Sequence, residues 1–183
     1  MNITAPLDEN TIRNLNAGDM VYISGTIYTA RDAAHKRMDE ALSRNEKLPI
    51  DIKGNVIYYM GPSPAREGHV IGSAGPTTAS RMDKYAPRLL DLGLSGMIGK
   101  GKRSKEVIAA MIRNGAVYFA AIGGAGALLS KAIKEAKVVA YDDLGTEAIR
   151  ELRVENFPAI VVIDCKGNNL YEISQKEFNS ESN

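Results

Sequence analysis

Three short segments of this chain combine small residues with a cation or a hydroxyl group: Ala30-Arg31-Asp32, Gly75-Pro76-Thr77-Thr78 and Gly99-Lys100-Gly101. The surrounding patterns predict that each segment joins a strand to a helix. Backbone N–H groups at the start of a helix attract negative charge, and glycine lets a ligand approach the main chain closely. These segments therefore predict sites for anions.

Two arginines, Arg31 and Arg81, could each hold a carboxylate through a bidentate pair of hydrogen bonds. Each charge-assisted bond contributes roughly 1.5 to 3 kcal/mol when it is partly shielded from water. Taken alone, either arginine fits a solvated or salt-bridged surface role better. Their joint occurrence at loop ends favours a ligand with two carboxylates.

Other chemical features of the sequence are less specific. The stretch Gly123-Gly124-Ala125-Gly126 matches neither the phosphate loop nor the full dinucleotide-binding fingerprint, so a tight turn explains it better than a nucleotide site. His35 and His69 could both transfer protons near neutral pH, but neither has metal-ligand spacing to a partner. The basic neighbours of His35 favour a solvated histidine or one that supports a binding residue, and the role of His69 stays open.

Composition limits the class of protein. With 183 residues, 44% of them hydrophobic, we expect one domain, and a net charge of +1 gives no broad field for nucleic acid or an anionic membrane. No apolar run approaches the roughly 20 residues that span a bilayer, and the N-terminus does not resemble a signal peptide, so we expect a cytoplasmic protein without membrane contact. Cys165 is the single cysteine, expected half-buried, and an iron–sulfur cluster usually takes three or four.

Periodicity predicts an α/β fold with a mixed sheet in a single domain. Helices are expected over 8–15, 31–44 and 128–134. Two further helices are expected, one that begins at Thr77 and is interrupted by Pro87, and one that is capped by Ser104 and ends at Gly115. Strands are expected over 20–25, 55–60, 94–98, 116–122 and 136–141. Residues 160–165 and 170–173 are expected to form a terminal hairpin around 166–169.

The motifs Thr29-Ala30-Arg31-Asp32-Ala33-Ala34-His35, Gly75-Pro76-Thr77-Thr78-Ala79-Ser80-Arg81-Met82-Asp83 and Gly99-Lys100-Gly101 occur in this order with characteristic spacing. Together they resemble class I fumarases, specifically the C-terminal domain of the single-chain enzymes. The same region is the β subunit of two-subunit fumarases and of the related L-tartrate dehydratase. The resemblance covers nearly the whole chain, with 1–174 as the fumarase C-terminal-like domain and 175–183 as a flexible tail. It implies a swivelling domain with β/β/α layers.

The resemblance also implies an activity, the reversible hydration of fumarate to L-malate. In this family a [4Fe-4S] cluster acts as the Lewis acid and is bound by the large N-terminal domain or α subunit, so a chain with one cysteine would need a cluster-bearing partner, in an α2β2 or similar assembly. By the same resemblance, Thr77 is the base that removes the proton next to a carboxylate, and Arg31, Arg81 and Lys100 bind the substrate. Ser80 stands where many relatives have glycine, which leaves Thr77 and Arg81 in place.

Spacing alone allows Thr77 to be an ordinary helix cap, with Arg81 one helical turn further on. A threonine hydroxyl is a poor base in water, so the catalytic role needs nearby cations and helix-end N–H groups. Two alternatives stay open at this point: the β subunit of L-tartrate dehydratase, and a noncatalytic module that binds a dicarboxylate or assembles with a larger subunit.

Overall fold

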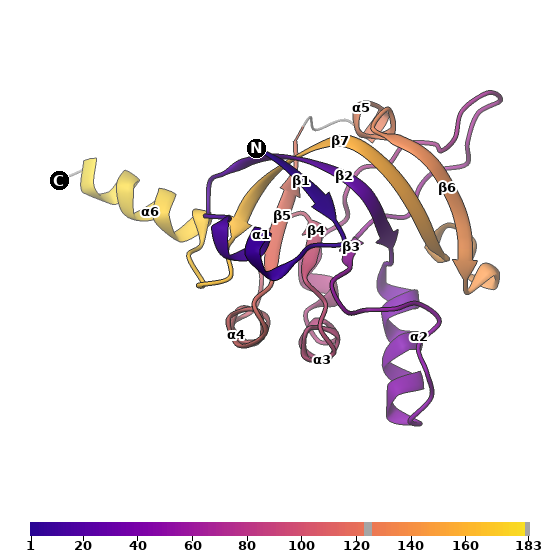
Figure 1. Ribbon diagram of the computed structural model, residues 1–183, viewed down its shortest axis with the longest axis horizontal. Coiled ribbons are helices and arrows are strands. Elements are labelled where there is room, and N and C mark those ends of the chain that lie inside the picture. Colours follow the sequence, from indigo (N-terminus) through magenta and orange to yellow (C-terminus); the bar gives the residue numbers. More distant parts are fainter. Residues whose placement is uncertain (123–125, 182–183) are drawn as a thin grey trace.

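The computed structural model describes residues 1–122 and 126–181 (Figure 1). The elements in chain order are β1 (Asn2–Ala5), α1 (Glu9–Asn14), β2 (Met20–Thr29), α2 (Asp32–Ser43), β3 (Val56–Tyr58), the 3₁₀ helix η1 (Ala79–Met82), α3 (Ala86–Asp91), β4 (Gly96–Gly99), α4 (Lys105–Asn114), β5 (Val117–Ala121), α5 (Gly126–Ser130), β6 (Ile133–Ala140), the 3₁₀ helix η2 (Asp142–Glu147), β7 (Ile149–Ile163) and α6 (Leu170–Glu181). None of these helices is long and apolar enough to cross a bilayer.

The strands form one mixed sheet that closes on itself. Their order is β1-β2-β3-β4-β5-β7-β6, and an additional pairing of β2 with β7 closes a ring of five strands. Strands β1 to β5 pair in parallel, whereas β7 runs antiparallel to β2, β5 and β6. The α/β class with a mixed sheet, expected from the sequence, is confirmed.

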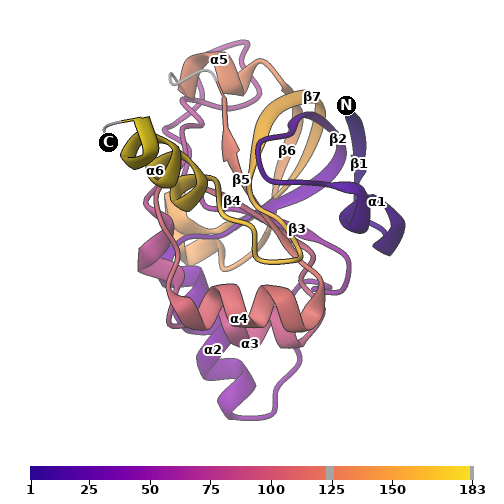
Figure 2. The same ribbon diagram turned by 90° about the vertical axis from the view of Figure 1, so that its left-hand side faces the viewer.

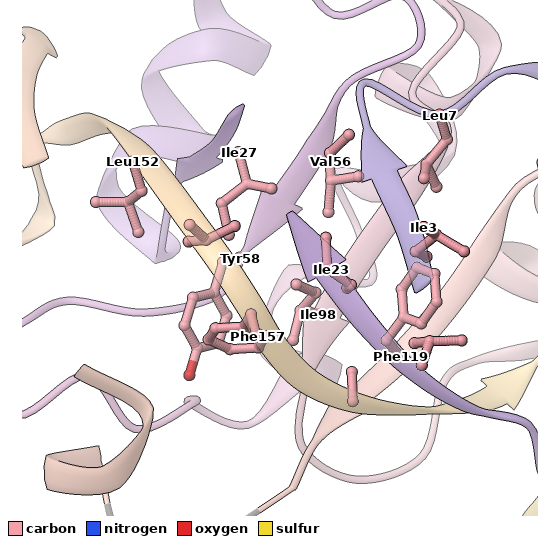
Figure 3. Packing of buried hydrophobic residues seen from close by; sticks show 14 of the residues in the cluster. Ile3, Leu7, Ile23, Ile27, Val56, Tyr58, Ile98, Phe119, Leu152 and Phe157 are labelled. Carbon is pink, nitrogen blue, oxygen red and sulfur yellow. The ribbon is translucent and has the colours of Figure 1, made fainter. Parts of the chain in front are cut away.

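Two hydrophobic cores lie on the two faces of the parallel strands. One fills the inside of the closed ring, where Tyr58 and Phe157 meet edge to face with ring centroids 5.3 Å apart (Figure 3). The other lies between the sheet and helices α2, α3 and α4, which together cover one outer face (Figures 1 and 2). The ring walls and this helical layer give the expected β/β/α order.

Local sequence signals explain where several helices begin and end. The Asp8 side chain accepts a hydrogen bond from the Thr11 N–H at 2.7 Å, and Ser104 Oγ caps α4 through the Val107 N–H at 3.2 Å. Helix α4 ends at Gly115, whose φ of 67° is a left-handed conformation that glycine adopts at low cost. These boundaries agree with the sequence-based expectation.

The stretch around Thr77 differs from the expected helix. Thr77 lies outside η1, which begins at Ala79, and the Thr77 N–H donates to the Tyr59 carbonyl at 2.7 Å. Pro87 does not interrupt a helix: it lies in the first turn of α3, where its missing N–H would have no helical partner. The prediction of a helical turn between Thr77 and Arg81 is therefore wrong.

The prediction of a terminal hairpin over 160–173 is also wrong. After β7, the buried Asp164 carboxylate accepts hydrogen bonds from the Lys166 and Asn168 N–H groups and tightens a turn. Asn169 Oδ1 then accepts from the Tyr171 N–H at 3.1 Å, which favours the start of a helix. Leu170–Glu181 is therefore α6 rather than a strand, and the flexible tail over 175–183 stays a prediction.

Candidate active site

Parallel strand order places the expected site residues along one edge of the sheet. Arg31 follows β2 and is the N-cap residue of α2, and Lys100 follows β4 directly. Thr77 is held against the end of β3 through its hydrogen bond to Tyr59. Because β2, β3 and β4 are adjacent and parallel, their carboxyl ends meet at the same edge, which is where α/β sheets commonly bind ligands.

The Thr77 and Lys100 segments are joined through their main chains. The Lys100 N–H donates to the Thr77 carbonyl at 3.2 Å, the Ala79 N–H donates to the Lys100 carbonyl at 2.8 Å, and Thr78 pairs with Lys100 in an isolated parallel bridge. No described residue hydrogen-bonds to the Thr77 hydroxyl. Thr77 directly precedes Thr78, the N-cap residue of the short 3₁₀ helix η1, and the main chain of this segment pairs with Lys100.

Arg81 and Arg31 approach each other through Asp32. The Asp32 carboxylate lies 2.5 Å from an Arg81 guanidinium nitrogen and 4.0 Å from one of Arg31. The side chains of Arg31 and Asp32 are 24% and 30% exposed, whereas that of Arg81 is 53% exposed. A carboxylate between two cations holds them on the same side of the site, and both guanidinium groups keep a surface open to a ligand.

A glycine shapes the space around Arg31. A Cβ atom placed on Gly61 would lie 2.8 Å from Arg31 Cδ and 2.9 Å from the Thr146 carbonyl oxygen. Any side chain at residue 61 would therefore displace the arginine or the backbone beside it. Gly61 therefore lets the Arg31 side chain pass close to the main chain that follows β3.

The side chain of His35 hydrogen-bonds to the main chain of Arg31. Its side chain is buried, and Nδ1 lies 2.8 Å from the Arg31 carbonyl oxygen, so Nδ1 carries the proton that is donated. Burial lowers the pKa of His35 to about 4, despite the opposing effect of the hydrogen bond to Arg31. The imidazole is therefore neutral near pH 7. Of the two roles expected for His35, its burial excludes a solvated histidine, and its hydrogen bond to Arg31 fits a histidine that supports a predicted binding residue.

A small pocket opens beside Lys100. It has a volume of about 220 Å³ and is lined by Gly75, Pro76, Gly99, Lys100, Gly101, Ala120, Ala121, Leu129 and Tyr171. Two larger depressions, of about 390 and 350 Å³, surround the loop 62–72, and His69 lines the second. Because the larger depressions contain none of Arg31, Thr77, Arg81 and Lys100, the pocket at Lys100 is the better candidate for substrate.

The described residues do not fit a metal centre. Over 1–122 and 126–181, no group of three or more His, Cys, Asp and Glu side chains could hold a metal ion. Cys165, the chain's one cysteine, is free and partly exposed, as expected. Residues 123–125, part of the glycine-rich stretch considered for a nucleotide, lie outside the described residues.

Sequence reasoning predicted four site residues but did not predict the residues that contact their segments. Asp32 belongs to the first motif, but its position between Arg31 and Arg81 depends on the packing of α2 near η1. Arg103 carries no sequence signal of burial, since it stands in a run of lysines and glycines, although its side chain is fully buried. Tyr171 reaches the pocket only because residues 170–181 are helical.

Together, the closed mixed sheet and this edge define an α/β domain in which Arg31, Lys100 and the Thr77 segment lie at the carboxyl ends of three adjacent parallel strands. The chain matches the family model described as "Fumarase C-terminus" over residues 1–174. It belongs to that family, and the resemblance inferred from the motifs is confirmed.

Relatives of two architectures match this chain. A putative L(+)-tartrate dehydratase subunit beta from Methanocaldococcus jannaschii is 40% identical over 183 residues, covering 97% of this chain and 94% of that protein. Fumarate hydratase 2 of Leishmania major is 39% identical and the aerobic class I fumarate hydratase of Salmonella typhimurium is 44% identical, covering 93% and 82% of this chain. The chain spans only 31% and 26% of those two fumarate hydratases.

Proposed function

We propose that this chain is the β subunit of a class I fumarate hydratase and catalyses, with a partner α subunit, the reversible hydration of fumarate to L-malate. The observation that carries the proposal is the convergence of Arg31, Thr77, Arg81 and Lys100 on one sheet edge. Membership of the fumarase C-terminus family supports the reaction class, which is that of a hydro-lyase.

In this proposal the cations bind the two carboxylates of the substrate. Arg31 and Arg81 lie together around Asp32, and Lys100 lines the pocket of about 220 Å³. When the proton beside a carboxylate leaves, negative charge develops on that carboxylate. Cations that are already in place stabilise this charge without having to reorganise, which is commonly the largest contribution to catalysis.

Thr77 is the proposed base. In the direction from malate to fumarate, its oxygen takes the proton from the carbon next to one carboxylate, the C–H electron pair forms the double bond, and hydroxide leaves the neighbouring carbon. A threonine oxygen can do this only as an alkoxide, which nearby cations must stabilise. The main-chain pairing with Lys100 supports this role because it brings a cationic residue to the Thr77 segment.

The proposed α subunit binds a [4Fe-4S] cluster, which would supply the Lewis acid for the leaving hydroxyl. Two observations support a partner: the residues described, 1–122 and 126–181, offer no metal centre, and the chain is 40% identical over 183 residues to a protein named as a subunit beta. An α2β2 or similar assembly is part of the proposal.

A second candidate is the β subunit of an L-tartrate dehydratase. The specific observation in its favour is the extent of the match, because the putative tartrate dehydratase subunit is 40% identical to this chain over 94% of that protein's length. Tartrate has the same dicarboxylate frame with an additional hydroxyl, so the same cations would bind it.

The test is anaerobic reconstitution of this chain with a cluster-bearing α subunit, followed by assays of fumarate formation from L-malate and oxaloacetate formation from L-tartrate. Thr77→Ala is compared with Thr78→Ala, the adjacent and exposed threonine. Thr77→Ala should lower kcat by at least about 100-fold, since general base catalysis contributes that much or more, while Thr78→Ala stays close to the native rate.

Turnover of malate that needs both chains supports the fumarase proposal, and a preference for tartrate selects the second candidate. Absence of both reactions with an intact cluster would favour a noncatalytic dicarboxylate-binding or assembly module. Native rates in Thr77→Ala would remove Thr77 from the mechanism.

A further inference from the structure

Arg103 is a buried cation with partners on three sides. Its side chain is 0% exposed; Nε donates to Asp83 Oδ1 at 2.8 Å, and one terminal nitrogen donates to the Tyr59 hydroxyl at 3.0 Å. The other terminal nitrogen lies 3.3 Å from Met97 Sδ. The guanidinium carbon also lies over two aromatic rings, 5.2 Å from the centroid of Tyr59 and 4.8 Å from that of Tyr118.

A buried arginine carries a desolvation penalty that its partners often only balance, so it is weak evidence for a purely stabilising role. Arg103 nevertheless forms an ion pair with Asp83 and packs against the rings of Tyr59 and Tyr118. The contacts around it show which segments this cation fixes.

The first set of contacts is a closed circuit through Thr77. The Tyr59 carbonyl accepts from the Thr77 N–H at 2.7 Å, and the Thr77 carbonyl accepts from the Lys100 N–H at 3.2 Å. Three residues beyond Lys100, the Arg103 side chain returns to the Tyr59 hydroxyl. The Thr77 main chain is thus held between two segments that Arg103 fastens to each other.

The second set of contacts fixes the chain on either side of this circuit. Asp83 follows η1, which carries Arg81, and its second oxygen accepts from the Ser104 N–H at 2.7 Å. The Tyr118 hydroxyl, from β5, donates to the Gly101 carbonyl at 2.8 Å. One buried guanidinium therefore links the segments that bear Thr77, Arg81 and Lys100.

We propose that Arg103 is a positioning residue that fixes the Thr77 and Lys100 segments relative to each other through Tyr59 and Asp83. It touches no substrate. The consequence for catalysis rests on the function proposed above; the consequence for local structure does not. Only one carbon separates the Thr77 hydroxyl from the main chain, so the position of the Thr77 main chain decides where the proposed base lies. The long and flexible Lys100 side chain can adapt to small shifts of its main chain.

The first measurement is amide hydrogen exchange on the full chain carrying Arg103→Lys. Lysine keeps the charge but loses the planar fork that reaches Asp83 and Tyr59 together. Exchange at the Thr77, Ala79 and Lys100 amides should become at least about tenfold faster, since local opening sets their protection.

The matched control is Arg113→Lys, because Arg113 makes an exposed bond to Asp91 at 2.7 Å, away from this edge. It should leave all three amides at native rates. Native protection of these amides in a folded Arg103→Lys chain would overturn the proposal. If that variant does not fold, Tyr59→Phe removes only the hydroxyl that Arg103 binds, and unchanged exchange at Thr77 would be equally decisive.

The second measurement is steady-state kinetics on the reconstituted two-chain complex. Arg103→Lys should lower kcat by about 10- to 100-fold and change KM much less, because a misplaced base slows the proton transfer more than it weakens binding. Leu152→Ala, a buried substitution in the ring core, is the control for lost stability and should leave kcat near native.

An equal fall of kcat in Leu152→Ala would mean that instability, not positioning, explains the effect. If the native complex turns over neither malate nor tartrate, the proposed function fails, while hydrogen exchange still decides whether Arg103 fixes these segments.

Discussion

The buried His35 should make stability depend on pH in a way that one substitution can remove. The imidazole is 1% exposed and lies against the rings of Tyr59 and Tyr85, with centroids 5.4 and 6.2 Å away. Arg103 and Asp32 are the charged groups that act on it, and they act in opposite directions. Burial therefore decides the outcome and lowers the pKa of His35 from its ordinary 6.5 to about 4.

The sign follows from proton binding in the two states. Between these two pKa values the unfolded chain binds a proton at His35 and the folded chain does not, so stability is full above the unfolded pKa and falls as pH decreases. Going from about pH 7 to about pH 5, this residue alone should reduce the free energy of unfolding by about 2 kcal/mol.

The assay is urea unfolding at the two pH values for the native chain, for His35→Asn and for His69→Asn. Asparagine can still donate to the Arg31 carbonyl but does not titrate, so His35→Asn should lose about 2 kcal/mol less between the two pH values than the native chain does. His69 lies in an exposed loop, and its replacement should retain the native pH dependence. Identical pH dependence in His35→Asn and the native chain would refute the argument that burial keeps this imidazole neutral.

Three further outcomes follow from the contacts at the site and in the core. Gly99→Ala would place a methyl group 2.8 Å from Tyr59 Cδ2 and 3.0 Å from Ala79 Cβ, so chemical unfolding should show a free energy of unfolding lower by about 1 to 3 kcal/mol. In the control Gly75→Ala, the nearest new contact is 3.7 Å, so the free energy of unfolding should fall less. Asp32→Asn should change the free energy of unfolding by less than about 1 kcal/mol, because the pair with Arg81 is exposed, but should raise KM in the reconstituted enzyme; an unchanged KM would show that Asp32 does not aim the arginine. Phe157→Ala should destabilise the chain by about 3 to 5 kcal/mol, because Phe157 is fully buried in the ring, and a smaller loss in urea unfolding would mean that the core collapses around the gap.

Local signals in the sequence were sufficient to predict many elements, and motifs supplied the candidate site residues. The helix over 31–44 follows from apolar residues at helical spacing, and the Ser104 cap with Gly115 defines α4, because capping depends on neighbours only a few residues away. Arg31, Thr77, Arg81 and Lys100 were found through motifs that resemble the family. Their catalytic and binding roles stay predictions.

Local signals failed where a distant partner decided the backbone. Thr77 looks like a helix start, but the Tyr59 carbonyl and the Lys100 N–H compete for its main chain and hold it in a strand-like pairing. Leu170–Ile173 alternates like a strand, yet the Asn169 side chain accepts a hydrogen bond from the Tyr171 N–H and a helix begins there instead. Propensity is a weak preference that such contacts readily override.

By itself the sequence determined the α/β class, the family and the residue types that could bind a dicarboxylate. These depend on periodicity and motifs that are written along the chain. Only the tertiary structure decided that the sheet closes through β2 and β7, that Asp32 lies between two arginines, and that Arg103 is buried and bonded to Asp83 and Tyr59. Those features join residues far apart in sequence, and their energies depend on burial and mutual distance, which exist only once the chain has folded.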